Sequence, residues 1–240
     1  MKSSPILLAV LLGICLATAG SALAAPRAAE AAGSHYLMAA DNLDGWHLGG
    51  FYRYADRELN HGAYALKQNK FMIHVGHDIL SWLSVYGFLG TTTLEIEPGF
   101  GDRDPDLEYG AGAWANLLDH DLLGNFTMET RLRLQAIGQV SASSPEIDGR
   151  EASYVEWYGA LTLGVVNELI GNKAYWPEAI GLFFGPVYND ISSDDIDATG
   201  GAFGLTVGLD LYLTRDTTLS LAYEGFESDK IYNAALNFRF

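Results

Sequence analysis

The sequence predicts an all-β protein, namely an antiparallel up-and-down transmembrane β-barrel of ten strands, with eight strands as the alternative. Apolar residues recur at every second position in many segments, which is the period of a strand and not of a helix. Hydrophobic residues make up 49% of the 240 residues, including 5 Trp, 13 Tyr and 11 Phe. Beyond the N-terminal segment, however, no apolar stretch approaches the roughly 20 residues of a membrane helix. A closed barrel reconciles these observations because its lipid-facing and lumen-facing residues alternate.

Residues 1–24 are expected to be a signal peptide. Lys2 gives a short positive start, an apolar run follows over residues 6–19, and small residues lead to an expected cleavage near Ala24. A lipid anchor on Cys15 is the alternative, but the residue before this cysteine is a bulky Ile, which does not suit a lipoprotein signal.

Charge and cysteine content narrow the classes of partner. Without residues 1–24 the chain has 13 basic and 30 acidic residues, a net charge of −17, and no cysteine for a disulfide. An acidic chain without basic clusters does not suit a phosphate backbone, so no nucleic-acid partner is expected. The expected surroundings are outer-membrane lipid and lipopolysaccharide, with the barrel-assembly machinery as a partner during insertion. A monomer without cofactor or metal is expected.

The barrel is expected over residues 46–240, after a periplasmic extension over residues 25–45. The clearest strand is 201–213, where apolar side chains alternate with Gly, Thr and Asp. An even number of strands places both chain ends on one side, here the periplasm. The predicted strands are 46–57, 63–77, 82–97, 107–119, 123–141, 151–168, 178–190, 201–213, 217–227 and 230–240.

Charged residues alternate with apolar ones in several of these strands and are therefore expected to face the lumen. A narrow barrel leaves little room for water, so these charges are expected to pair across the lumen and largely fill it. A gated pore or an ion path is the alternative. The expected lumen charges are Arg53, Glu129, Arg131, Arg133, Glu156, Asp210, Glu224 and Arg239.

The last strand resembles the C-terminal assembly signal of bacterial outer-membrane proteins, in which alternate apolar residues lead to an aromatic end read by the barrel-insertion machinery. The matching residues are Tyr232, Asn233, Leu236, Phe238 and Phe240, whereas Ala235 departs from the Gly often found there. Residues 82–90, Trp-Leu-Ser-Val-Tyr-Gly-Phe-Leu-Gly, are similar to a stretch that follows the first periplasmic turn of small OmpA-like transmembrane barrels. The resemblance covers roughly residues 46–240. It implies the fold and an outer-membrane location, and it fixes no role.

Acidic, aromatic and histidine residues raise further hypotheses. Two acidic runs expected in outer loops could bind Ca²⁺ or form a solvated surface: Asp102, Asp104, Asp106 and Glu108, and Asp190, Asp194, Asp195 and Asp197. Aromatic residues near strand ends suit interfacial girdles: Trp46, Tyr52, Tyr54, Trp82, Trp114, Trp157, Tyr188, Phe238 and Phe240.

Four histidines raise the alternative of a rim enzyme, such as a protease, a lipid A deacylase or an acyltransferase: His61, His74, His77 and His120. The sequence contains neither a Gly-x-Ser-x-Gly elbow nor a His-Glu-x-x-His motif. No catalytic residue is therefore assigned. A narrow channel for small solutes and a soluble lipocalin-like binder are the other rivals.

Overall fold

The structure is a computed structural model and describes residues 45–59, 64–80, 82–97, 105–122, 130–147, 150–151, 153–168, 177–193, 201–214 and 216–239. The chain divides into a unit Met1–Ser34, outside these ranges, and a unit His35–Phe240, which contains all of them. Within the described ranges, no helix is long and apolar enough to cross a membrane. The predicted signal peptide and residues 25–44 of the predicted extension lie outside the described residues.

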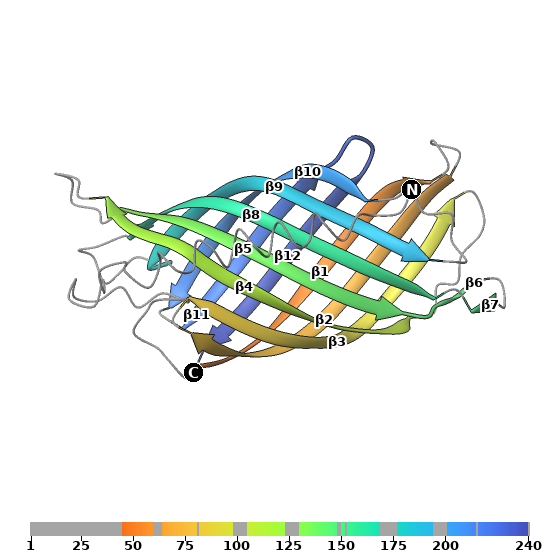
Figure 1. Cartoon of the computed structure of the whole chain (residues 1–240), viewed down its shortest axis with the longest axis horizontal. Helices are drawn as coiled ribbons and strands as arrows, with labels where there is room; N and C mark the ends of the chain where they lie inside the picture. The colour runs from red at the N-terminus through yellow and green to blue at the C-terminus, as the bar shows by residue number, and fades with distance from the viewer. Residues whose placement is uncertain are drawn as a thin grey trace. The chain divides into compact units, whose positions relative to one another are not determined.

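Ten antiparallel strands close into one barrel, as predicted, which excludes the eight-strand alternative. The ring closes where β1, orange in Figure 1, pairs with β12, dark blue. The order around the ring is β1-β12-β11-β10-β9-β8-β5-β4-β3-β2. The strands are β1 (Trp46–Leu59), β2 (Tyr64–Leu80), β3 (Leu83–Glu97), β4 (Asp106–Leu122), β5 (Thr130–Ser143), β8 (Tyr154–Glu168), β9 (Ala179–Ser193), β10 (Ala202–Thr214), β11 (Thr217–Gly225) and β12 (Lys230–Arg239). A separate hairpin of β6 (Glu146–Ile147) and β7 (Arg150–Glu151) lies between β5 and β8 in the chain.

The predicted end of the fourth strand at residue 119 is wrong, because β4 continues to Leu122. A β-bulge between Asn116 and Leu118 explains the difference. The extra residue shifts the alternation of the strand, so the acidic side chain of Asp119 turns inward and pairs with arginines of β5. The strand predicted from residue 123 is described from Thr130 onward.

Burial in this barrel is inverted relative to a soluble protein. Along β2 the apolar Phe71, Ile73 and Val75 are 59%, 55% and 48% exposed on the outer face, whereas Lys70 and His74 are buried. This pattern follows from the strand period of two, because every second side chain points away from the lumen. An apolar outer wall around a polar interior is the arrangement of a transmembrane barrel.

Candidate functional site

The largest described group of interacting charges lies toward the end of the lumen opposite the start of β1 and the end of β12. This end is predicted to face outward and is called the outer end here. Three cations and three carboxylates balance each other there, and all six side chains are buried. Glu108 and Glu156 are each the third residue of their strand, and Glu224 is the last but one of β11. We name this group the outer ion-pair cluster: Arg53, Arg57, Lys70, Glu108, Glu156 and Glu224.

Glu156 on β8 is the centre of the outer ion-pair cluster. Its Oε1 lies 3.1 Å from Arg53 Nη1 and 2.9 Å from Arg57 Nη2, and both arginines come from β1. Lys70 on β2 donates to Glu156 and also to Glu108. In the ring, β1 and β8 are five strands apart in either direction. The bridge from Arg53 and Arg57 to Glu156 therefore spans the full width of the lumen.

Neutral side chains complete the hydrogen bonding of these carboxylates, as buried charges require. Asn189 Nδ2 donates to Glu156 Oε1 at 2.6 Å, and Arg57 Nη1 donates to Asn189 Oδ1 at 2.6 Å. The other donors are Tyr154 to Glu108 (2.9 Å), Tyr158 to Glu224 (2.8 Å) and Asn233 to Glu224 (2.7 Å). The outer ion-pair cluster is thus held by contacts from β1, β2, β4, β8, β9, β11 and β12.

An apolar group covers the outer side of this cluster. Leu66, Leu94, Tyr154 and Ile191 are buried together. Leu66 lies four residues nearer the outer end than Lys70 on β2, and Ile191 comes from β9, which stands opposite β2 in the ring. We name this group the apolar cap.

Below the outer ion-pair cluster, an aromatic layer fills the β1–β4 side of the lumen. Its core is Met72, Tyr86 and Phe88, packed against Phe51 and Trp114. The ring of His47 stacks on Trp114 with 4.6 Å between centroids. Trp114 was expected in an interfacial girdle, which is wrong. The outward positions on either side of it in β4 are alanines, and its own position points inward.

Two buried histidines of this layer need glycine on the neighbouring strand. His47 of β1 pairs in register with Gly76 of β2, and Gly49 of β1 pairs with His74 of β2. A Cβ atom on Gly76 would lie 2.0 Å from Cε1 of His47, and one on Gly49 would lie 2.4 Å from Cε1 of His74. Each imidazole therefore occupies the space that a side chain on the facing residue would need.

A second charged group lies toward the end of the lumen at which β1 begins, which is the end predicted to face the periplasm. Asp119 of β4 holds Arg131 Nε at 3.3 Å and Arg133 Nε at 3.2 Å, and both arginines come from the adjacent β5. Arg133 Nη1 also donates to the hydroxyl of Tyr212 on β10 at 3.0 Å. We name these four residues the periplasmic ion-pair cluster. Tyr212 packs in turn against Val166 and Ala179.

The closing seam of the barrel carries its own ion pair. Arg239 of β12 pairs with Asp78 of β2, on the far side of β1, and Ser84 of β3 donates to the same aspartate. The backbone N–H of Arg239 donates to the carbonyl of Asp216 at 2.8 Å. We name the Arg239–Asp78 pair the seam latch.

Seven of the eight expected lumen charges lie inside the barrel. Asp210, where Ser220 donates at 2.6 Å, is half-buried, and the other six are buried. The lumen also contains Arg57, Lys70, Asp78 and Asp119, which the sequence reasoning left out. Glu108, expected in a solvated acidic loop, is instead fully buried. The expected residues outside the described ranges are Glu129, Phe240, His61, Asp102, Asp104, Asp194, Asp195 and Asp197.

The described histidines that were considered for a rim enzyme do not lie together in one site. His74 lies in the aromatic layer, His77 stacks on Trp46 with 4.8 Å between centroids, and His120 is exposed on β4. No group of three or more His, Cys, Asp or Glu among the described residues is placed to hold a metal ion.

The described residues of the expected assembly signal, Tyr232, Asn233, Leu236 and Phe238, lie in β12, which pairs with β1. Tyr232, Leu236 and Phe238 are exposed on the outer wall. Asn233 points into the lumen, where it donates to Glu224.

The sequence matches no protein-family model, and it matches no curated protein. Several solved structures resemble the chain. The transport unit of the autotransporter AIDA-I from Escherichia coli is 12% identical, with 83% of this chain and 91% of that chain covered and a TM-score of 0.42. The β domain of the Bordetella autotransporter Brka is 14% identical over 83% and 100% of the two chains, with a TM-score of 0.45. Neisserial surface protein A is 13% identical over 81% and 97%, with a TM-score of 0.38.

At these identities the likeness concerns architecture and says nothing about role. The strand pairing and the inverted burial determine the fold on their own. The chain is a ten-stranded antiparallel β-barrel of the outer-membrane type.

Proposed function

We propose that this chain is an integral outer-membrane barrel whose lumen is closed by its own side chains, and that it serves a structural or surface-interaction role. The observation that carries the proposal is the contact of Arg53 and Arg57 with Glu156, at 3.1 and 2.9 Å, between opposite strands of the ring. A charge pair that spans the lumen leaves no wide aqueous path at its level. Small barrels commonly fill their interior with side chains in this way.

The layers on either side of the outer ion-pair cluster support the same proposal. The apolar cap joins β2 and β3 to β8 and β9 above the cluster. The aromatic layer and the contact of Arg133 with Tyr212 lie below it. A solute would have to displace the charged contacts of the cluster and the apolar contacts of the cap.

Recording currents in planar lipid bilayers tests this closure. The protein, shown to be folded by its heat-modifiable gel mobility, is expected to give no discrete current steps. Reproducible single-channel openings of the wild-type barrel would contradict a closed lumen.

A narrow channel for small solutes is the second candidate, and one observation favours it. The aromatic layer comes from β1–β4, whereas β8 and β9 present the small inward residues Thr162, Gly164 and Gly185 to the lumen. Small side chains on this wall occupy less of the lumen than the aromatic side chains of β1–β4. This candidate predicts discrete openings whose conductance rises with salt concentration in the same bilayer recordings.

Export belongs to the same proposal. We expect a signal peptide cleaved near Ala24, recognition of β12 by the assembly machinery, and a monomer in lipid that contains lipopolysaccharide. N-terminal sequencing of the protein extracted from outer membranes checks the cleavage. Extraction without detergent would favour the soluble lipocalin-like binder instead.

The proposal includes no catalytic residue. Of the histidines considered for a rim enzyme, His74 is buried in the aromatic layer, and His61 lies outside the described residues. Cells that carry His61→Ala and His74→Ala are expected to keep the wild-type lipid A and protease profiles. A changed profile would favour the enzyme.

A further inference from the structure

Three imidazole nitrogen atoms of the aromatic layer are buried without a hydrogen-bond partner among the described residues. They are Nδ1 and Nε2 of His47 and Nε2 of His74. The two residues are only 2% and 4% exposed. Because buried polar atoms are nearly always hydrogen-bonded or bound to an ion, these three nitrogens point to a ligand between or beside the two rings.

The two imidazoles lie diagonally across β1 and β2, and the separation of their rings suits one shared ion. His47 is the second residue of β1, and each ring lies over the glycine that faces it, Gly76 or Gly49. The ring centroids of His47 and His74 are 5.8 Å apart. Two imidazoles that bind one ion in a line hold their centroids about 6.2 Å apart, because each nitrogen lies about 2.0 Å from the metal and about 1.1 Å from its own ring centre. The observed separation is that of two imidazole ligands bent from this line.

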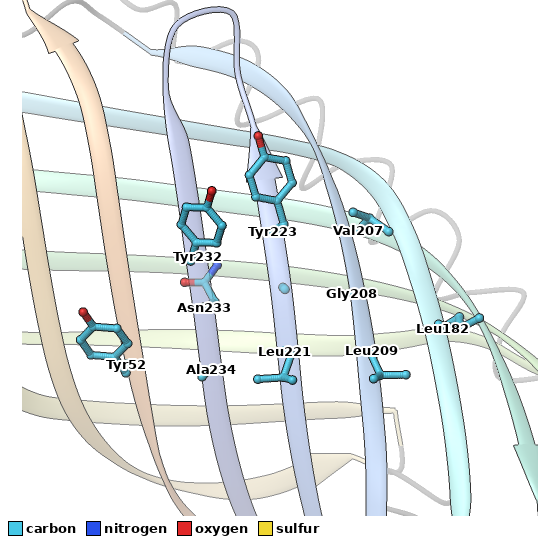
Figure 2. A pocket seen from close by; sticks show the side chains of 11 residues that line it. Tyr52, Leu182, Val207, Gly208, Leu209, Leu221, Tyr223, Tyr232, Asn233 and Ala234 are labelled. Atoms are coloured by element: carbon cyan, nitrogen blue, oxygen red, sulfur yellow. The ribbon is translucent and has the colours of Figure 1, made fainter.

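The closing strand β12 orients the ring of His74. Tyr232 and Ala234 of this strand lie on the outer wall of the barrel (Figure 2). Asn237 alternates with these positions and faces the lumen, where its side chain forms a hydrogen bond with His74. Since Nε2 of His74 has no partner among the described residues, this bond uses Nδ1. Metal-binding histidines are commonly held through one ring nitrogen in this way, while the other nitrogen binds the ion.

The surroundings of the two rings select the class of ion. Imidazole binds both copper and zinc, but zinc sites use three or four protein ligands, and among the described residues no third His, Cys, Asp or Glu joins this pair. The thioether of Met72 turns toward β3, where a Cβ on Gly90 would lie 2.7 Å from its sulfur. Arg239, the register partner of His47, is already balanced by Asp78. Monovalent copper needs only two ligands and adds a single buried charge, so it fits this site better than a divalent ion.

We propose that His47 and His74 bind one monovalent copper ion, through Nε2 of His74 and one ring nitrogen of His47. Trp114 stacks on the imidazole of His47 with 4.6 Å between centroids and holds it in place. The site does not depend on closure of the lumen, because both ligands come from adjacent strands of one wall.

Titration of the full chain with Cu⁺ tests the proposal, with the protein folded in detergent micelles under reducing conditions and in competition with a chromogenic Cu⁺ chelator. The wild type is expected to bind one equivalent more than His74→Phe or His47→Phe, and the latter keeps an aromatic ring against Trp114. His120→Phe is the matched control, because His120 is exposed on β4, and it should bind as much copper as the wild type. Equal binding by the wild type and the variants of His47 and His74 would overturn the proposal and assign the buried nitrogens to water.

X-ray absorption at the copper edge of the loaded wild type tests the same site without a variant. The expected spectrum has two nitrogen neighbours at about 2 Å from the copper, with the scattering pattern of imidazole. A sulfur neighbour, or four or more ligands, would overturn the assignment. This measurement decides the site even where heat-modifiable mobility shows that the phenylalanine variants do not fold.

Competition between metals tests the choice of ion. Zn²⁺ is expected to be retained at least ten-fold less tightly than Cu⁺ by the wild type, because the pair offers zinc too few ligands. Tighter retention of Zn²⁺ would overturn the assignment to monovalent copper.

Discussion

The outer ion-pair cluster joins strands on opposite walls of the barrel, whereas the periplasmic ion-pair cluster mainly joins neighbours. Glu156 of β8 meets Arg53 and Arg57 of β1 across the lumen. Asp119 of β4 meets two arginines of the adjacent β5. The same chemistry thus has different consequences according to its position in the ring. Pairing between neighbours joins adjacent strands of the wall, and pairing between opposite strands crosses the lumen.

The two clusters also differ in how much one substitution removes. Without the charge of Glu156, three buried cations share two carboxylates. Without Arg133, Asp119 still has Arg131. The outer cluster is therefore expected to be the more sensitive of the two.

The largest expected effect is that of Glu156→Gln. Removing one partner of a buried ion pair costs roughly 3–5 kcal/mol because an uncompensated charge stays buried. Urea titration of the barrel in vesicles, followed by heat-modifiable mobility, measures the loss. Glu58→Gln, at an exposed position near the outer end of β1, is the control and should stay within about 0.5 kcal/mol of the wild type.

Arg133→Ala is expected to cost less, about 2 kcal/mol, from the lost bonds to Asp119 and Tyr212. Because the outer ion-pair cluster is intact in this variant, bilayer recordings should stay silent. Single-channel openings in Arg133→Ala, together with no openings in Glu156→Gln, would show that the periplasmic ion-pair cluster, and not the outer one, blocks the lumen.

Gly76→Ala tests the aromatic layer between the clusters. Its new methyl group would lie 2.0 Å from Cε1 of His47 and 2.7 Å from the carbonyl oxygen of Val85, and overpacking of this kind costs about 1–3 kcal/mol. Gly138→Ala is the matched control, because a Cβ there meets nothing within 4 Å. Equal urea midpoints for the two variants would show that the layer is not tightly packed.

The smallest expected effect is that of Tyr158→Phe, which removes one partly buried hydrogen bond to Glu224 and should cost about 1 kcal/mol. Tyr52→Phe removes the exposed bond to Asn69 and should cost less. The difference between the two urea midpoints measures how much burial adds to the stability contributed by one hydrogen bond. A larger loss from Tyr52→Phe would show that water reaches the outer ion-pair cluster.

The strands could be predicted from the sequence because the lipid imposes apolar residues at every second position. Alternation also indicates which side chains face inward, and Arg53, Glu156 and Glu224, predicted on that side, are buried in the structure. Alternation could also have assigned Arg57 and Lys70 to the lumen. Arg57 is four residues after Arg53 in the same strand, and Lys70 alternates with exposed apolar residues of β2.

Partners across the lumen could not be predicted in this way. Alternation indicates whether a side chain points into the lumen, but not its level along the barrel axis. That level depends on the tilt and stagger of the strands in the closed barrel. The contact of Arg57 with Glu156 is therefore invisible in the sequence. The bulge at Asn116–Leu118 also interrupts the parity of β4, so Asp119 could not be assigned to the lumen.

The seam latch has a consequence for the order of folding. Arg239 and Asp78 are 161 residues apart in the chain, and the pairing of β12 with β1 is similarly remote. Contacts at such separation carry a large entropic cost of loop closure and form slowly. Until they form, β1 and β12 are two open edges whose unpaired backbone groups can recruit another chain. The seam latch can form only when β12 has reached β1, so it belongs to the contacts that end the exposure of these two edges to another chain.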